Sequence, residues 1–230
     1  MSKQNVNERA QVAALRTNIY GLLSRIFICE VDARFLEELR QQKFINTLKE
    51  LGVDLGQAFL EQPIEEQLED LAVEYTRLFL GPGKHLSPHE SVYISTFSGQ
   101  QDSKQGLLWG AATVKVNEFI EEVGYQLAAD YPGIPDHLGV ELGLMQQLAK
   151  REETAWQAGD IDQAAKLVAE QDYFLREHIL KWVPQFCQQV AADTVNDFYR
   201  VMAKLTQELI AFDHGQIAEL AEAVMVRPNH

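Results

Sequence analysis

The sequence predicts an all-α protein, a multihelical bundle of about eight to ten helices. Three observations predict this fold class. Apolar residues recur at helical spacing through most of the chain, and glycine or proline separates the periodic segments. No segment of useful length alternates apolar and polar residues, as a half-buried strand would. With 230 residues, the chain can form one sizeable core or two small lobes.

Four helices are expected in the first half of the chain, each with an apolar stripe. Their ranges are 8–29, 32–51, 64–80 and about 104–123. Gly52 is placed to end the second helix, and Gly81-Pro82-Gly83 ends the third. The segment between the third and fourth helices, residues 81–103, is rich in glycine, proline, serine and histidine. A loop of this length inside a compact domain is usually functional.

The second half is expected to hold four more helices. Their ranges are 136–157, 160–182, 185–213 and 215–225. Asp136 follows Pro135 and is expected to be the N-cap of the first of these helices. Gly159 separates the first from the second, and Pro184 marks the next boundary.

The two irregular segments suggest how a single domain is organised. We expect an N-terminal helical lobe over about 1–123, a linker over 124–135, and a C-terminal lobe over 136–230. The linker contains two glycines and two prolines. Because exchange of identical elements is a low-cost route to a dimer, we expect a monomer that exchanges slowly with a domain-swapped dimer.

Composition and charge exclude several classes of protein. The formal charge of −14 disfavours nucleic acid as a partner and favours a basic peptide. No run approaches the roughly 20 apolar residues that span a bilayer, and the N-terminus does not read as a signal peptide. Cys29 and Cys187 are too few for a disulfide framework. These features predict a protein of the cytoplasm, with no membrane insertion.

The loop residues fail the tests for two kinds of chemistry. Gly83-Lys84 is followed by His85, and Leu78 stands where a phosphate-binding loop needs its first glycine. The chain has no G-x-S-x-G motif, and neither cysteine has a context that indicates activation. We therefore expect no enzymatic nucleophile.

A metal site is a weaker alternative that the sequence leaves open. His89-Glu90 would begin a zinc motif, but Tyr93 occupies the position of the second histidine. His137 and Glu141 are spaced to share one helix face, where a simple His–Glu pair is the more ordinary arrangement. The alternative function is thus a metal-dependent hydrolase with His89, Glu90, His137 and Glu141 as ligands. His178 lies on an apolar stripe and is expected to be a core histidine.

Aromatic residues flank the long loop and allow two interpretations. Tyr75, Phe79, Tyr93, Phe97 and Trp109 could line a groove for apolar side chains of a peptide. They could equally close the core beneath the loop, and spacing alone does not decide between these arrangements.

Two motifs resemble those of the TorD/DmsD family of redox-enzyme maturation chaperones. "EYTRLFLGPGKHLSPHESVY", residues 74–93, is similar to the family's Leu-Phe-x-Gly-Pro segment and the Pro-rich loop after it. "YPGIPDHLGVELGLM", residues 131–145, resembles its Pro-x-Asp-His segment and the helix that follows. A weaker match is "HILKWVPQF", residues 178–186.

The resemblance implies an all-helical cytoplasmic chaperone with no enzymatic activity. Such proteins bind the twin-arginine signal peptide, and sometimes the body, of the apo form of a molybdoenzyme until its cofactor is inserted. It implies no required cofactor, although some members bind guanine nucleotide or the molybdenum cofactor. The expected peptide-binding residues, from the motifs and their aromatic flanks, are Tyr75, Leu78, Phe79, Pro88, His89, Glu90, Ser91, Tyr93, Trp109, Asp136, His137 and Glu141.

Overall fold

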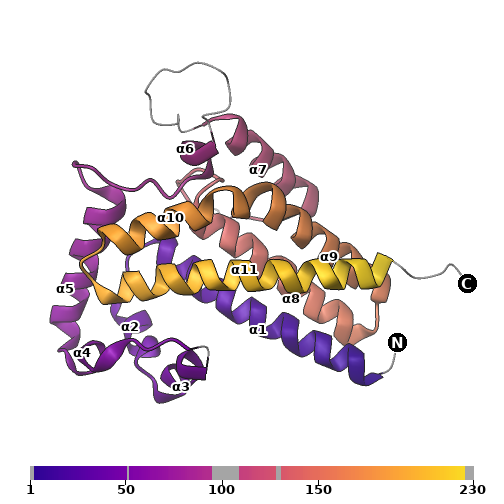
Figure 1. Ribbon diagram of the computed structural model, residues 1–230, viewed down its shortest axis with the longest axis horizontal. Coiled ribbons are helices and arrows are strands. Elements are labelled where there is room, and N and C mark those ends of the chain that lie inside the picture. The colour runs from indigo at the N-terminus through magenta and orange to yellow at the C-terminus, as the bar shows by residue number, and fades with distance from the viewer. Residues whose placement is uncertain (1–2, 51, 95–108, 128–130, 226–230) are drawn as a thin grey trace, which may run out of the picture. The chain divides into compact units, whose positions relative to one another are not determined.

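The computed structural model describes residues 3–50, 52–94, 109–127 and 131–225 (Figure 1). Within these residues all regular structure is helical, which confirms the predicted fold class. The helices are α1 (Lys3–Ile28), α2 (Ala33–Leu39), α3 (Gln42–Glu50), α4 (Gly56–Glu61), α5 (Ile64–Tyr75), α6 (Glu90–Ile94), α7 (Ala111–Val123), α8 (Leu138–Ala158), α9 (Ile161–Phe174), α10 (Leu180–Asp193) and α11 (Asp197–Met225).

Two π-helical segments extend the α-helices without a break. The segment η1 (Thr76–Leu80) continues α5, and η3 (Leu175–Ile179) joins α9 to α10. The described residues therefore form ten continuous helical segments, within the predicted range of eight to ten. None of the described helices is both long enough and apolar enough to cross a membrane.

The chain divides into two compact units. Unit 1 contains residues 1–28, 89–183 and 209–230, and unit 2 contains residues 29–88 and 184–208. This division differs from the expected lobes over 1–123 and 136–230, because unit 1 combines α1 from the first half with α8 and α9 from the second.

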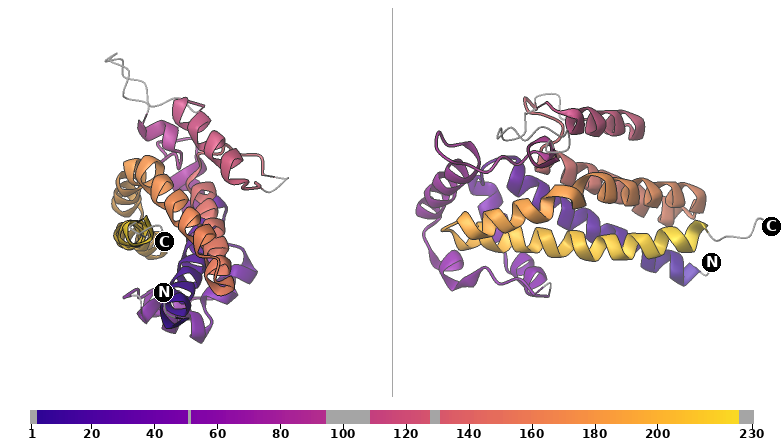
Figure 2. Two further views of the ribbon diagram at one scale, coloured as in Figure 1. Left: turned by 90° about the vertical axis from the view of Figure 1, so that its right-hand side faces the viewer. Right: turned by 45° about the horizontal axis from the view of Figure 1, so that its top comes forward.

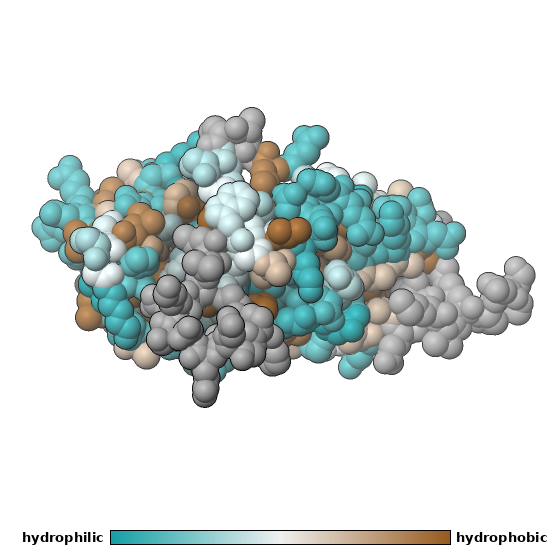
Figure 3. Space-filling model, turned by 90° about the horizontal axis from the view of Figure 1, so that it is seen from above, coloured by the Kyte–Doolittle hydropathy of each residue, from teal (hydrophilic) through white to brown (hydrophobic). Residues whose placement is uncertain are grey.

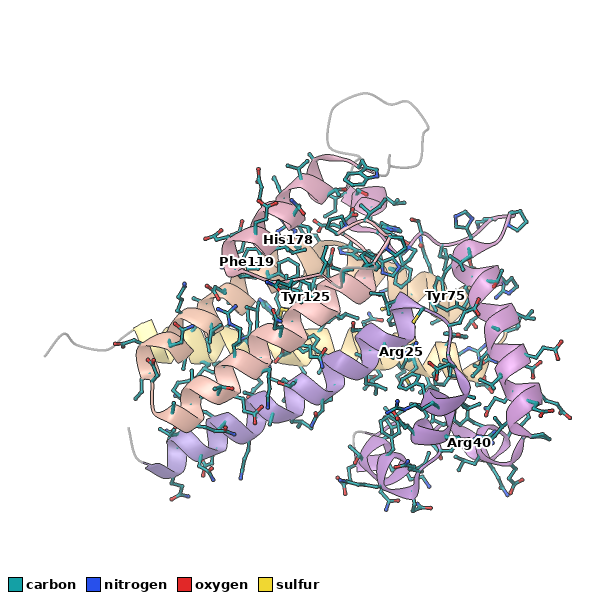
Figure 4. All side chains as sticks on the ribbon, turned by 180° about the vertical axis from the view of Figure 1, so that it is seen from behind. Arg25, Arg40, Tyr75, Phe119, Tyr125 and His178 are labelled. Atoms are coloured by element: carbon teal, nitrogen blue, oxygen red, sulfur yellow. The ribbon has the colours of Figure 1, made fainter. Side chains whose placement is uncertain are left out.

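The central contact of unit 1 is between α1 and α8, which lie side by side in Figures 1 and 4. The helices touch where Gly139 meets Ile28, since an added Cβ at Gly139 would lie 2.6 Å from the Cβ of Ile28. The hydroxyl of Ser24 donates to the Gly139 carbonyl oxygen at 2.6 Å. The glycine of the "DHLG" stretch is thus explained by close helix packing.

A buried polar network joins four helices of unit 1. Arg16 of α1 donates to Asp213 of α11 at 2.5 Å and to Glu152 of α8 at 2.7 Å. It also donates to the side-chain oxygen of Gln171 of α9 at 2.6 Å, and Tyr20 donates to Asp213 at 2.6 Å. Every arm of the guanidinium group has an acceptor, so this buried charge is paired and hydrogen-bonded.

Unit 2 has an aromatic core. Tyr75 and Phe79 lie edge to face at 5.1 Å, and Phe79 stacks with Phe186 at 5.9 Å. Glu74 binds the last turn of α5 to the turn before α11: it accepts from Arg77 at 2.7 Å and from Thr194 Oγ1 at 2.5 Å. Burial raises the pKa of Glu74, but the hydrogen bonds from Arg77 and Thr194 outweigh this and lower it.

Three predicted boundaries are wrong. The expected helix 32–51 is two helices, because Arg40 ends α2 and its guanidinium donates to the Gln62 carbonyl oxygen at 2.6 Å. Pro184 lies inside α10, where buried Val183 and Phe186 on either side of it keep the helix packed. The break expected near residue 214 lies at 194–196 instead, where the Asn196 side chain accepts from the Phe198 amide.

Other boundaries agree or fall partly outside the described residues. Gly159 ends α8 with a φ of 71°, and Asp160 caps α9 by accepting from the Gln163 amide. The expected loop 81–103 includes a short helix, α6. The fourth expected helix begins at Ala111 rather than near 104, and residues 104–108 lie outside the described residues.

Candidate functional site

The two sequence motifs meet in unit 1. His89 and His137 form an isolated antiparallel bridge, and the Glu90 amide donates to the Asp136 carbonyl oxygen at 2.9 Å. The start of α6 is thereby fixed to the residues that precede α8. Residues about 45 positions apart in the sequence share one site, which we call the motif junction: His89, Glu90, Ser91, Asp136, His137 and Glu141.

Asp136 is the buried centre of this junction, with no exposed surface. Its Oδ2 accepts from the Ser91 amide at 2.9 Å and from the Thr113 hydroxyl at 3.1 Å, so it connects α6, α7 and the start of α8. Oδ1 has no hydrogen-bond partner among the described residues. The prediction that Asp136 caps α8 is wrong, because the cap is the next residue.

His137 is the N-cap of α8. Its backbone is extended, and Nδ1 accepts from the Gly139 amide at 3.0 Å. The ring lies edge to face against His89, with centroids 5.0 Å apart. Burial, with a contribution from His89, lowers the pKa of His137 to about 3. Burial also lowers the pKa of His89, although Asp136 opposes the shift. A neutral His137 is what capping needs, since a protonated Nδ1 could not accept from Gly139.

Glu141 does not pair with His137. Its Oε2 accepts from the Trp182 indole at 3.1 Å. Burial raises the pKa of Glu141 well above its ordinary value, and the carboxylate of Glu90 raises it further. Glu141 therefore holds a proton under conditions where an exposed glutamate is ionised.

His178 is a core histidine, as the sequence predicted. It is 2% exposed, it stacks on Phe174 with centroids 4.8 Å apart, and its Nδ1 lies 2.9 Å from Oε2 of Glu90. His178 belongs to the π-helical segment η3. Segments of this kind are frequent at functional sites.

A surface pocket opens beside His178. It has a volume of about 260 Å³ and is lined by α7, by the α9–η3 region and by the start of α10. The rings of Phe119, Tyr173 and His178 contribute to it, and the other lining side chains are charged: Lys115, Glu118, Glu122, Glu177 and Lys181. Figure 4 shows Phe119 and His178 next to each other. We call this the α7–α9 pocket. Sequence reasoning did not single out Phe119 or Tyr173, and the spacing of the apolar residues gave no sign that they share a pocket.

Two further expected residues lie at the surface of unit 1 or close to it. Tyr93 is half-buried, with its ring 5.4 Å from that of Trp182. Trp109 is 70% exposed and has a φ of 70°, a region that disfavours bulky residues. An exposed aromatic ring on a strained backbone is typical of functional positions.

The remaining expected residues belong to unit 2 and are buried. Tyr75, Leu78 and Phe79 are at most 4% exposed and pack into the aromatic core described above. Pro88 is buried too, and the Leu86 amide donates to the Leu78 carbonyl oxygen at 2.7 Å. Of the two interpretations of the aromatics, Tyr75 and Phe79 follow the core arrangement. Phe97 lies outside the described residues.

The proposed metal ligands are not arranged as a metal site. Among the described residues, no group of three or more histidine, cysteine, aspartate or glutamate side chains is placed to hold a metal ion. His137 caps a helix, and Glu141 binds an indole. The hydrolase alternative thus has no structural support within the described part of the chain.

The fold and the motif junction define an all-α protein in which two sequence motifs share one site. Residues 34–188 match the nitrate reductase delta subunit family, and the chain belongs to this family. Similar relatives are two proteins named chaperone protein TorD. The one from Shewanella pealeana is 26% identical over 88% of this chain and 89% of its own, and the one from Shewanella piezotolerans is 29% identical over 90% and 92%.

A solved structure agrees on the fold. It is described as a redox enzyme maturation protein from Archaeoglobus fulgidus, with a TM-score of 0.51 and 18% identity, and the match covers 85% of this chain and 93% of that one. The chain is accordingly a TorD-like redox enzyme maturation chaperone, from a family of chaperones rather than enzymes.

Proposed function

We propose that this chaperone acts in the cytoplasm and binds the twin-arginine signal peptide of a molybdenum-cofactor oxidoreductase, holding the precursor until its cofactor is inserted and export can follow. One observation carries the proposal. The two motifs that resemble the TorD/DmsD family meet at one site, where Asp136 accepts from the Ser91 amide. The proposal does not depend on guanine nucleotide, nor on the chaperone itself holding the molybdenum cofactor.

The exposed apolar residues of unit 1 support a peptide-binding surface. Trp109 is 70% exposed, Val114 is 55% exposed, and Tyr173 is 47% exposed. Val114 belongs to α7, and Tyr173 lines the α7–α9 pocket. We assign the apolar run of the signal peptide to this surface. The buried junction residues then act by holding helices in place rather than by touching the peptide: Asp136 joins α6, α7 and the start of α8, and Glu141 joins α8 to Trp182 of α10.

Charge supports the choice of a basic peptide. The chain carries a formal charge of −14, and hydrophilic residues predominate on the face seen in Figure 3. Opposite charges accelerate encounter and select partners more than they add affinity. Salt screens exposed charges over about 8 Å at physiological ionic strength, so association should be slower in high salt.

The free energies expected for peptide binding fit a chaperone that must release its client. Burial of three or four leucine-sized side chains contributes roughly 5–10 kcal/mol. Ordering a flexible peptide costs about 2–5 kcal/mol, and association has its own cost. Even the most favourable combination, about 10 kcal/mol gained less about 2 kcal/mol for ordering, leaves about −8 kcal/mol before the cost of association, so apolar burial alone supports an affinity no tighter than about micromolar.

Tryptophan fluorescence offers a direct test. Trp156 and Trp182 are fully buried, so Trp109 is the only exposed one of the three tryptophans, all of which lie in described residues. We expect a synthetic twin-arginine signal peptide to change the emission of the parent chain but not of Trp109→Phe, with micromolar affinity and an on-rate that falls with salt. A scrambled peptide of equal composition is the control, and equal binding of both peptides would contradict the proposal.

A second experiment separates signal binding from binding of the enzyme body. Pull-down of a full-length precursor and of its signal-deleted form should favour the full-length form. Equal capture would place the main contact on the folded body.

The oligomeric state is part of the same proposal. We expect a monomer that exchanges slowly with a domain-swapped dimer, and the contact between the Glu90 amide and the Asp136 carbonyl oxygen ties down the C-terminal end of the 124–135 linker. Size-exclusion chromatography with light scattering on separated pools tests this. Re-equilibration within seconds would indicate an ordinary surface contact.

A further inference from the structure

A second pocket lies at the far end of the α1–α8 contact from the motif junction. It has a volume of about 310 Å³ and is lined by the first half of α1, by α8 and by the last turns of α11. All of its lining residues belong to unit 1. Figures 1 and 2 show the start of α1 near the end of α11. We call it the α1–α11 pocket. Its volume falls in the range of ligand pockets, about 300–1,000 Å³.

The buried part of the lining carries a formal negative charge. Arg16, Glu152 and Asp213 all line the pocket, and their side chains are at most 7% exposed. One guanidinium group faces two carboxylates, so the trio has a formal charge of −1. Burial alone would lower the pKa of Arg16, but Asp213 and Glu152 raise it above its ordinary value, so this cation is fixed. A charge imbalance with little access to water gives a stronger field than the same charges in solvent.

The exposed part of the lining adds to this charge. Glu8 and Glu219 are exposed and line the pocket together with Arg9, whose guanidinium lies 5.0 Å from the Trp156 ring centroid. The whole lining thus has four carboxylates and two guanidinium groups, a formal charge of −2. That charge is complementary to two cationic side chains.

Apolar side chains complete the pocket. Val12 of α1 is 48% exposed and lines it, as do Ile217 and Leu220 of α11. A long side chain with an apolar stem and a cationic head suits such a surface, because the stem covers carbon while the head reaches the carboxylates. Arginine suits it better than lysine, since its planar guanidinium is less strongly hydrated and binds carboxylates through two parallel hydrogen bonds.

We infer that the α1–α11 pocket receives the arginine pair of the client's signal peptide, while the apolar run that follows reaches toward the α7–α9 pocket. This inference rests on the proposed function and assigns its charged subsite.

The test is a cycle of chain and peptide variants. The pocket variant is Glu8→Gln with Glu219→Gln, two exposed substitutions that leave the buried trio intact. The matched control is Glu66→Gln with Glu69→Gln, which changes the net charge equally on exposed residues of α5 in unit 2. Each chain is titrated with a twin-arginine signal peptide and with the same peptide carrying two glutamines in place of the arginines.

We expect the pocket variant to bind the twin-arginine peptide about tenfold more weakly than the parent does. We expect its affinity for the glutamine peptide to be unchanged, and the control variant to match the parent with both peptides. If the pocket variant and the control bind the twin-arginine peptide equally, the pocket is not the arginine subsite, although the proposed function stands. If the parent does not distinguish the twin-arginine peptide from a scrambled one, the proposed function fails as well.

Discussion

His178 and Glu90 form a buried pair in unit 1, with Nδ1 of the histidine 2.9 Å from Oε2 of the glutamate, although they are 88 positions apart in the sequence. Both side chains are 3% exposed. The pair joins the π-helical segment η3 to the first residue of α6, and so connects the weaker family-like stretch, residues 178–186, to the stretch at residues 74–93.

Loss of this pair should destabilise the chain. Glu90→Ala leaves Nδ1 of His178 buried without its partner, and an unsatisfied buried polar group costs about 1–3 kcal/mol. We expect urea unfolding to show a loss of that size, a smaller loss for Glu90→Gln, and little change for the exposed control Glu69→Ala. A Glu90→Ala variant as stable as the parent would mean that the pair contributes nothing.

His137 should make the protein less stable in mild acid. Its folded pKa of about 3 lies below the ordinary value of 6.5, so the unfolded chain takes up a proton that the folded chain does not. The stabilisation is complete above about pH 6.5 and falls with pH, by about 2 kcal/mol at pH 5. His137→Asn keeps an acceptor for the Gly139 amide and should flatten this dependence.

Urea unfolding at pH 7 and at pH 5 tests whether the low pKa of His137 causes this loss of stability. The control is the substitution of the exposed His85 by asparagine. Direct support would come from an NMR titration in which the His137 ring stays neutral at pH 5. A ring that titrates near pH 6.5 would refute the assignment.

Glu141 should make the protein less stable as the pH rises, which is the opposite of the effect expected for His137. Its folded pKa is raised well above 4.5, so above that pH the unfolded chain releases a proton that the folded chain keeps, and stability declines as the pH rises. Glu141→Gln retains an acceptor for the Trp182 indole without titrating. We expect its stability relative to the parent to increase from pH 5 to pH 8, unlike that of Glu69→Gln. A constant difference would show that Glu141 is ionised in the fold.

Gly139 and Gly215 form a contrasting pair of helical glycines. A Cβ at Gly139 would collide with the α1 backbone at Ile28, whereas a Cβ at exposed Gly215 in α11 meets nothing within 4 Å. Gly139→Ala should destabilise by about 1–3 kcal/mol through overpacking. Gly215→Ala should stabilise by about 0.5–1 kcal/mol through helix propensity. Urea midpoints that move in the same direction would contradict the packing argument.

Local signals predicted much of the secondary structure. The apolar stripe of α1 and the helix break at Gly159 are each decided by neighbouring residues, and both agree with the structure. Proline was the misleading signal, because buried neighbours outweighed the hydrogen bond lost at Pro184. Asn196 was a signal that the sequence analysis missed. Its side chain accepts from the Phe198 amide at the start of α11, but the apolar pattern continues on both sides of it and favoured one continuous helix.

The sequence by itself determined the all-α class, the acidic character and the two motifs, because periodicity, charge and residue order are local properties of a chain. Only the tertiary structure decided that Asp136 binds Ser91 and Thr113 instead of capping a helix, and that Tyr75 and Phe79 fill a core. It also decided that Arg16, Glu152 and Asp213 come together at a pocket. A side chain's partners and burial depend on helices distant in the sequence, and no spacing rule within one helix contains that information.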